Sequence, residues 1–192
     1  MIAGLLADAR NAMIGLARLV SFREGWRPCF DTSTNGLIRS FGAMILAAPA
    51  FVMFVLAANY IVSSAGAVSA EARYTPLEAI GSYARIWLLF PVVAIGVVSV
   101  LGLKHRYVSW VVVHNWAVFA LLHLAALLYL LYPAGLADTT ALAMLLQLYL
   151  FARLFLHWRV AVSALETGMA TGAAAAGIPI ILDLLAIYLV SR

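Results

Sequence analysis

Five long apolar stretches constrain what this chain can fold into. Each has roughly the 20 mainly apolar residues that an α-helix needs to cross the hydrocarbon core of a bilayer. Lipid offers backbone groups no hydrogen-bond partners, so such segments span as helices. The expected spans are residues 39–63, 84–103, 108–132, 138–161 and 168–190. The predicted fold class is therefore all-α, a polytopic transmembrane bundle of five helices.

The composition excludes a water-soluble domain. Hydrophobic residues make up 66% of the 192 residues and charged residues only 10%, whereas soluble domains carry about 25% charged residues. The 12 basic residues exceed the 8 acidic ones. In a membrane protein this excess reflects orientation and anionic headgroups. No compact basic cluster is interleaved with aromatic residues, so the expected partner is the lipid bilayer and not nucleic acid.

The segment before the first span predicts an amphipathic helix over residues 2–20. Its apolar residues recur at helical spacing, and Asp8, Asn11 and Arg18 line the opposite face. We expect it to lie in the headgroup plane with its apolar face down. A cytosolic helix packed on the bundle is the alternative. Residues 21–36 form a connector that completes an N-terminal region of residues 1–36, followed by the transmembrane domain of residues 37–192.

Turn and capping residues mark the connections. Asp31 or Ser33 is expected to cap the helix that carries Arg39 into the membrane. The longest loop between spans is predicted over residues 64–83, where Thr75-Pro76 is expected to open a short surface helix.

Basic residues predict the orientation of the spans. Nine lie in segments assigned to one side and three, namely Arg73, Arg85 and Arg192, in segments assigned to the other. The nine are Arg10, Arg18, Arg23, Arg27, Arg39, Lys104, Arg106, Arg153 and Arg159. Cytoplasmic loops are the ones rich in Lys and Arg. The N-terminus is therefore expected in the cytoplasm and the C-terminus on the far side.

Asp183 is the sharpest candidate functional residue, because ionisable groups inside spans are expensive and often functional. His123, on a span that runs in the same direction, is expected at nearly the same depth. An Asp183–His123 pair would hold or relay a proton. A structural hydrogen bond between helices is the competing interpretation.

Arg153 and His157 are four residues apart on one helix face, with Tyr149 one turn earlier on that face. Arg153 is expected either to reach the headgroups or to pair with a carboxylate. Glu166 is the nearest carboxylate along the chain.

No cofactor or metal is expected. His114 and His123 are nine residues apart, which places them on opposite faces of a helix, so they do not share one metal or haem. The single cysteine, Cys29, excludes an intrachain disulfide and a cysteine-based metal site.

The last span carries a stripe of small residues, Gly168, Gly172 and Ala176, at four-residue spacing. Such a stripe lets another helix approach closely. The partner helix is expected within the bundle, in a second protomer or in another subunit.

Several short motifs carry a resemblance. The chain runs through Phe30-Asp31, Gly36, Arg39-Ser40-Phe41, Arg106-Tyr107-Val108 and His114-Asn115-Trp116 to the small-rich last span with Asp183. It resembles uncharacterised alphaproteobacterial membrane proteins related to the Yip family of Rab/Ypt-interacting five-span proteins. The resemblance implies five spans, a bacterial inner membrane and no enzymatic role. The long N-terminal domain and Asp-Leu-Tyr-Gly-Pro signature of eukaryotic members are absent, so Rab binding is not implied.

Two functions are consistent with these features. The first is a non-enzymatic accessory, assembly or membrane-organising subunit that works through helix contacts or self-association. The second is a small oligomeric transporter or channel whose polar path uses Asp183, His123, Arg153, His157 and His114. They differ in whether these side chains line a hydrated cavity or are sealed by neighbours.

Overall fold

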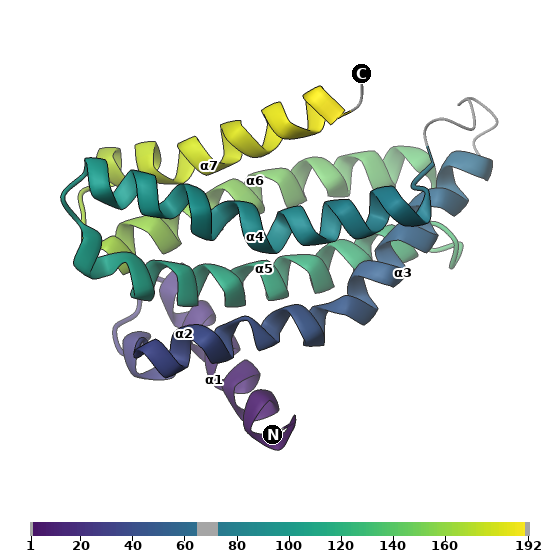
Figure 1. Cartoon of the computed structure of the whole chain (residues 1–192). Coiled ribbons are helices and arrows are strands. Elements are labelled where there is room, and N and C mark those ends of the chain that lie inside the picture. The colour runs from purple at the N-terminus through teal and green to yellow at the C-terminus, as the bar shows by residue number, and fades with distance from the viewer. Residues whose placement is uncertain (1, 65–72, 191–192) are drawn as a thin grey trace.

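The computed structural model describes residues 2–64 and 73–190, and every regular element in these ranges is a helix (Figure 1). Five of the described helical segments are long and apolar enough to cross a membrane. The predicted all-α bundle of five spans is thus confirmed. The α-helices are α1 (Ile2–Val20), α2 (Thr34–Ser40), α3 (Gly42–Ser64), α4 (Pro76–Val100), α5 (Tyr107–Leu130), α6 (Thr139–Leu165) and α7 (Met169–Val190), with 3-10 turns η1 (Arg27–Cys29) and η3 (Lys104–Arg106).

Side-chain caps set where three of these helices begin. Ser33 caps α2 by accepting a hydrogen bond from the Gly36 N–H, as predicted for that position. Asp138 caps α6 in the same way through the Ala141 N–H. Thr75 and Glu78 form a reciprocal capping box at the start of α4. Each cap satisfies backbone donors that the first helical turn leaves free.

The start of α4 differs from the prediction. The Thr75-Pro76 pair was expected to open a separate short helix within a loop over residues 64–83. It instead begins α4, which continues unbroken to Val100. The expected loop is partly outside the described residues, which resume at residue 73. Because α4 begins at Pro76, Arg85 lies nine residues inside a span, about 13 Å from its start at 1.5 Å per residue.

Helix α5 is the centre of the bundle. It packs against α3, α6, α2, α4 and α1. Its residues 110–118 are all buried, including Trp110 and Trp116. The other spans keep large apolar side chains exposed, for example Ile45 on α3 and Met144 on α6. A central helix surrounded by helices with one apolar outer face is the arrangement expected in lipid.

Helices α4, α5, α6 and α7 form a ring in which neighbouring helices pack, α4 on α5, α5 on α6, α6 on α7 and α7 on α4. Helix α3 packs on α5 outside this ring. Figure 1 shows α4 and α7 running side by side at the end where α7 begins, with α7 diverging toward its C-terminus. The ring positions the site described below.

Helix α1 packs against the bundle through one face. Ala9, Ala12, Leu16 and Leu19 are buried in the common core, while Leu6 and Ile14 are exposed. Asp8 forms an ion pair with Arg39 of α2, and Arg159 of α6 donates to the Leu19 carbonyl at 3.0 Å. The main apolar face of α1 was expected to face the headgroups, and the structure instead supports the alternative of a helix packed on the bundle.

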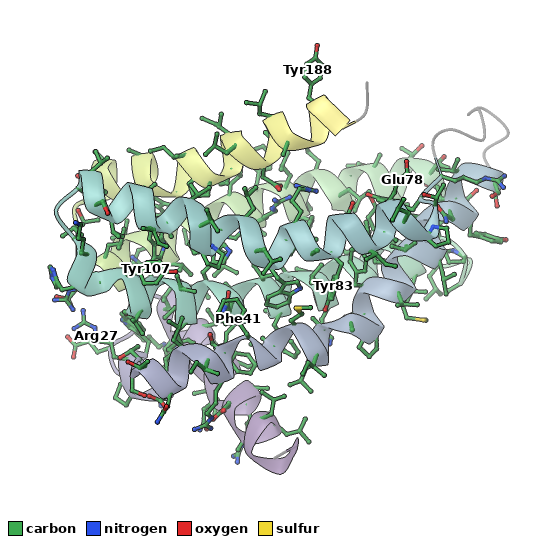
Figure 2. All side chains as sticks on the ribbon, in the orientation of Figure 1. Arg27, Phe41, Glu78, Tyr83, Tyr107 and Tyr188 are labelled. Atoms are coloured by element: carbon green, nitrogen blue, oxygen red, sulfur yellow. The ribbon has the colours of Figure 1, made fainter. Side chains whose placement is uncertain are left out.

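Most basic side chains gather at one end of the bundle, which we call the basic end. Its residues are Arg18, Arg23, Arg27, Arg39, Lys104, Arg106 and Arg159. Glu166, at the α6–α7 turn, ties this end together by pairing with both Arg27 and Arg106. Figure 2 shows Arg27 at this end and Glu78 at the opposite one.

Candidate functional site

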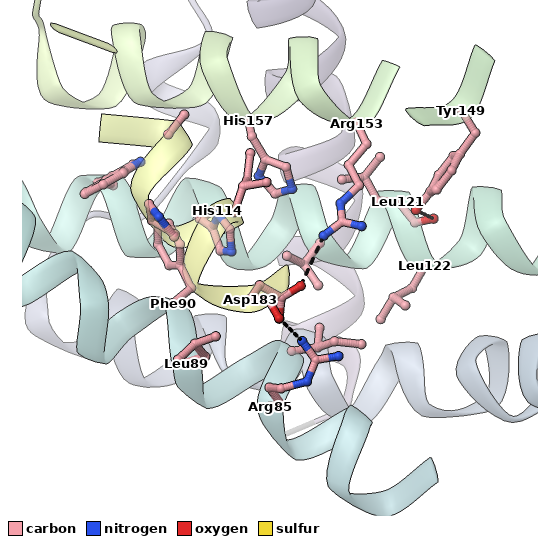
Figure 3. Close-up of a pocket in the computed structure, with 16 residues that line it drawn as sticks. Arg85, Leu89, Phe90, His114, Leu121, Leu122, Tyr149, Arg153, His157 and Asp183 are labelled. Carbon is pink, nitrogen blue, oxygen red and sulfur yellow. Dashed lines mark hydrogen bonds and ion pairs between the residues drawn. The ribbon is translucent and has the colours of Figure 1, made fainter. Parts of the chain in front are cut away.

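A cavity of about 140 Å³ lies inside the ring of α4, α5, α6 and α7. Much of its wall is apolar, from Ile86 and Leu89 on α4 to Ile180 on α7. Six side chains with ionisable groups also line it, and Figure 3 shows them converging from all four helices. They are Arg85, His114, Tyr149, Arg153, His157 and Asp183.

The carboxylate of Asp183 lies between two arginines. Its Oδ1 forms an ion pair with Nη1 of Arg85, and its Oδ2 lies 3.6 Å from Nη2 of Arg153 (Figure 3). Nη1 of Arg85 is also 3.5 Å from the Asp183 carbonyl oxygen. One carboxylate thus joins α4, α6 and α7 across the cavity, contacting a single terminal nitrogen of each guanidinium group.

These charges lie deep in the spans. Asp183 and Arg153 are each fourteen residues after the first residue of α7 and α6, or about 21 Å along the helix. At this depth charged groups pair with one another or face water-filled space, because hydrocarbon solvates them poorly. The depth explains why Asp183 and both arginines turn inward toward the cavity.

Three aromatic rings stack along another part of the cavity wall. The His114 ring of α5 lies flat on Phe90 of α4, with centroids 3.3 Å apart and an interplanar angle of 3°. The His157 ring of α6 stacks 5.0 Å from the His114 ring. Both histidines are buried. Their contact joins α5, about two turns after its first residue, to α6 one turn beyond Arg153.

Tyr149, Arg153 and His157 occupy one face of α6, as their four-residue spacing predicts, and all three line the cavity. The Tyr149 hydroxyl donates to the Leu121 carbonyl of α5 at 3.3 Å. One face of α6 therefore supplies three of the six ionisable side chains that line the cavity.

His123 lies elsewhere. It does not line the cavity, and its Nδ1 is 2.8 Å from the carbonyl oxygen of Phe119 on its own helix. Within the described part of the chain, Asp183 pairs with arginines and not with His123. Equal depth was the basis for expecting the Asp183–His123 pair, and depth does not determine which face of α5 a residue occupies.

Arg153 also has a different partner from the one nearest in sequence. Glu166 was the expected carboxylate, but it pairs with Arg27 and Arg106 at the basic end. Glu166 lies thirteen residues after Arg153, near the end of α6, so it is about 20 Å away along that helix axis. The carboxylate that reaches Arg153 comes from α7.

The small-residue stripe packs within the chain. A Cβ placed on Gly172 would overlap Cγ2 of Val162 on α6, so this glycine permits close contact of α6 and α7. Ala176 is buried and lines the cavity. Gly168 differs from the prediction, since a Cβ there would meet no atom within 4 Å. It precedes the first residue of α7 and lies beyond the helix crossing.

Arg85 is the site residue that the sequence did not single out. Arg85 was predicted at the outer edge of a span that begins at residue 84. Because α4 begins earlier, at Pro76, Arg85 lies inside the span. The signal available in the sequence was Asp183, because a carboxylate at that depth requires a cationic partner.

The described residues contain no group of three or more His, Cys, Asp or Glu side chains arranged to hold a metal ion. The polar lining is cationic in balance, with two arginines against one aspartate. Comparisons of the chain with protein-family models, with curated proteins and with solved structures find no match.

Proposed function

We propose that this chain is a non-enzymatic multi-pass membrane protein that admits a small polar solute into the cavity between α4, α5, α6 and α7, as a small transporter or channel does. The observation that carries the proposal is the convergence of Arg85, Arg153 and Asp183 on one cavity in the middle of apolar helices. Sealed structural pairs leave no such space around their charges.

The number of polar groups supports a binding role. One arginine is enough to neutralise Asp183, yet Arg153, His114, His157 and Tyr149 line the same cavity. Ionisable groups within spans are expensive, and they mark substrate and ion pathways. The surrounding apolar wall with a few convergent polar groups is the composition of small-molecule sites.

The charge distribution supports an orientation for this protein. The basic end contains seven of the arginines and lysines, and such ends face the cytoplasm. This orientation places the N-terminal helix inside and the C-terminus of α7 outside. Together with the resemblance to Yip-related bacterial proteins, it favours a bacterial inner membrane.

A role as an accessory or assembly subunit stays a prediction. One of its motivations was the small-residue stripe, and Gly172 and Ala176 of that stripe make contacts within the chain. The exposed apolar side chains of α6, such as Met144 and Leu148, are equally suited to lipid.

Cysteine accessibility tests the proposed cavity. Cys29 is the single cysteine, so a Cys29→Ser chain provides a clean background. Leu122→Cys places a thiol in the cavity wall, and Leu124→Cys, two residues on, places one on the exposed side of the same helix. Both proteins are reconstituted in vesicles and treated with a membrane-impermeant, negatively charged methanethiosulfonate reagent.

We expect rapid labelling at residue 122 and none at residue 124, because water reaches the cavity and hydrocarbon covers the other site. Labelling of neither thiol in folded protein, with both labelled after solubilisation in denaturing detergent, would show that the cavity is sealed. That result would favour the accessory or assembly role over the transporter or channel role.

A further inference from the structure

We infer that the solute is a small monocarboxylate with a short apolar body, and that it binds beside Asp183 and competes with Asp183 for the positive charge of Arg85 and Arg153. The inference rests on the proposed solute-binding function and names the class of solute. It is carried by the geometry of Arg85, Asp183 and Arg153, by the charge balance of the cavity and by its volume.

The two guanidinium groups are only partly used. Asp183 contacts Nη1 of Arg85 and Nη2 of Arg153, and among the described residues no other side chain pairs with either arginine. A guanidinium group offers five N–H donors in a planar fork that fits a carboxylate through two parallel hydrogen bonds. Each arginine therefore has donors left for a second carboxylate.

The charge balance calls for one further negative charge. With the histidines counted as neutral, two arginines and one aspartate leave a single formal positive charge around the cavity. The excess charge falls on Arg153, whose side chain is 38% exposed, so water compensates part of it and a bound anion would compensate the rest. A monoanion restores neutrality, whereas a neutral solute leaves the charge and a dianion reverses its sign.

The volume and the wall define the rest of the solute. The cavity of about 140 Å³ is close to the roughly 150 Å³ of an engineered apolar cavity that holds benzene. It is well below the range of roughly 300–1,000 Å³ that is typical for drug-sized ligands. Ile86, Leu89 and Ile180 line it with hydrocarbon. A carboxylate carrying a few carbon atoms fits both the space and the apolar wall.

Asp183 is then an internal competitor for the arginines. An entering carboxylate takes the unused donors of Arg153, whose contact with Asp183 at 3.6 Å is the longer of the two. Arg85 keeps Asp183 in place through its own ion pair. In the empty site Asp183 therefore neutralises one of the two arginines, and in the filled site the solute neutralises the other. Neither state places a charge in hydrocarbon.

Calorimetric titration of the full chain in lipid nanodiscs tests the inference with a matched pair of probes. Butyrate carries the charge, and butyramide has nearly the same shape without it. Succinate tests a second charge and chloride tests the need for an apolar body. We expect saturable binding of butyrate and at least about tenfold weaker binding of the other three, since a charge-assisted hydrogen bond changes affinity by that order.

Variants assign the effect to residues. Arg153→Gln is expected to weaken butyrate binding by about tenfold or more, and Arg153→Lys, which keeps the charge but not the fork, by less. Asp183→Asn is expected to tighten it, because the competing carboxylate is gone, an outcome that a purely structural Asp183 does not produce. Arg10→Gln, at an exposed position on α1, is the charge-matched control with no effect. Circular dichroism and a monodisperse elution profile establish that each variant is folded.

The outcomes separate this inference from the proposed function. If butyramide and butyrate bind equally, and if neither affinity changes in folded Arg153→Gln or Arg153→Lys, the solute is not a carboxylate. The proposed solute cavity would still stand. Absence of binding by all four probes would overturn it too. In that case, labelling of Leu122→Cys would still support a solute cavity, and no labelling would remove both proposals.

Discussion

Arg85 on α4 and Asp183 on α7 form an ion pair between residues 98 positions apart in the sequence, inside a ring of apolar helices. The pair closes the ring on the side where α7 meets α4. Its side chains are largely shielded, with 23% of Arg85 and 19% of Asp183 exposed. In this environment each charge depends on its partner, which makes the pair a target for a double-mutant cycle.

We expect Arg85→Gln and Asp183→Asn each to lower the free energy of unfolding by about 1–3 kcal/mol. Arg85→Gln leaves Asp183 with only the longer contact to Arg153, and Asp183→Asn leaves both arginines without a carboxylate. The double variant is expected to lose less than the sum of the single losses. Reversible unfolding in mixed micelles measures all three. Ser99→Ala on α4, whose hydroxyl donates to the Ile95 carbonyl of its own helix, is the control. Strictly additive losses would show that the two residues are not coupled.

The two glycines near the α6–α7 turn are expected to respond differently to a side chain. Gly172→Leu forces apart the close contact with Val162 and is expected to destabilise the protein by about 1–3 kcal/mol. Gly168→Leu adds the same side chain where a Cβ meets nothing within 4 Å, and its effect is expected within about 0.5 kcal/mol. Unfolding in mixed micelles compares them. A tolerated leucine at residue 172 would contradict the packing of α6 on α7.

Stability is expected to fall at acid pH through Asp31, which lies in the connector outside the spans. Hydrogen bonds from Ser33, first from its hydroxyl and then from its backbone N–H, lower the pKa of Asp31 below its ordinary value of 3.8, and the Arg39 charge adds to this. A folded-state pKa below the unfolded one stabilises the protein above pH 3.8, and that stabilisation is lost as the pH falls through the folded pKa.

The contribution is small because the Asp31 side chain is 46% exposed. Melting temperatures between pH 6 and pH 3, compared for the natural chain and Asp31→Asn, measure it. The difference between the two is expected to shrink toward the acid end. A difference that grows as the pH falls would have the wrong sign for a lowered pKa.

The orientation is tested by reporters fused after Arg192. If the basic end is in the cytoplasm and the chain crosses five times, both reporters lie in the periplasm. Alkaline phosphatase, which is active only there, is expected to be active, and green fluorescent protein, which is exported unfolded, is expected to be dark. Adding positive charge to the opposite end tests whether the basic residues determine this orientation. Lysines introduced at Ala134 and Leu136, in the turn between α5 and α6, are expected to reduce correct insertion, since this turn lies opposite the basic end. A fluorescent C-terminal fusion would contradict the orientation.

The sequence by itself determined the number and approximate limits of the spans. Runs of apolar residues and the cap Ser33 are local features, and lipid obliges such runs to be helical. The shared face of Tyr149, Arg153 and His157 follows from helical periodicity alone. The basic residues that gather at one end are likewise visible as loops rich in Lys and Arg.

Only the tertiary structure decided which helices meet and how each is rotated about its axis. Depth could be counted from the sequence, and it matched Asp183 with His123, but rotation turns Asp183 toward Arg85 and Arg153. Nearness in sequence matched Arg153 with Glu166, although that carboxylate lies at the basic end. Which residues meet in a bundle depends on which helix faces pack together. A helix that is apolar all round has no hydrophobic periodicity, so its sequence does not show which face packs inward. That is why the cavity and its arginines emerged from the fold.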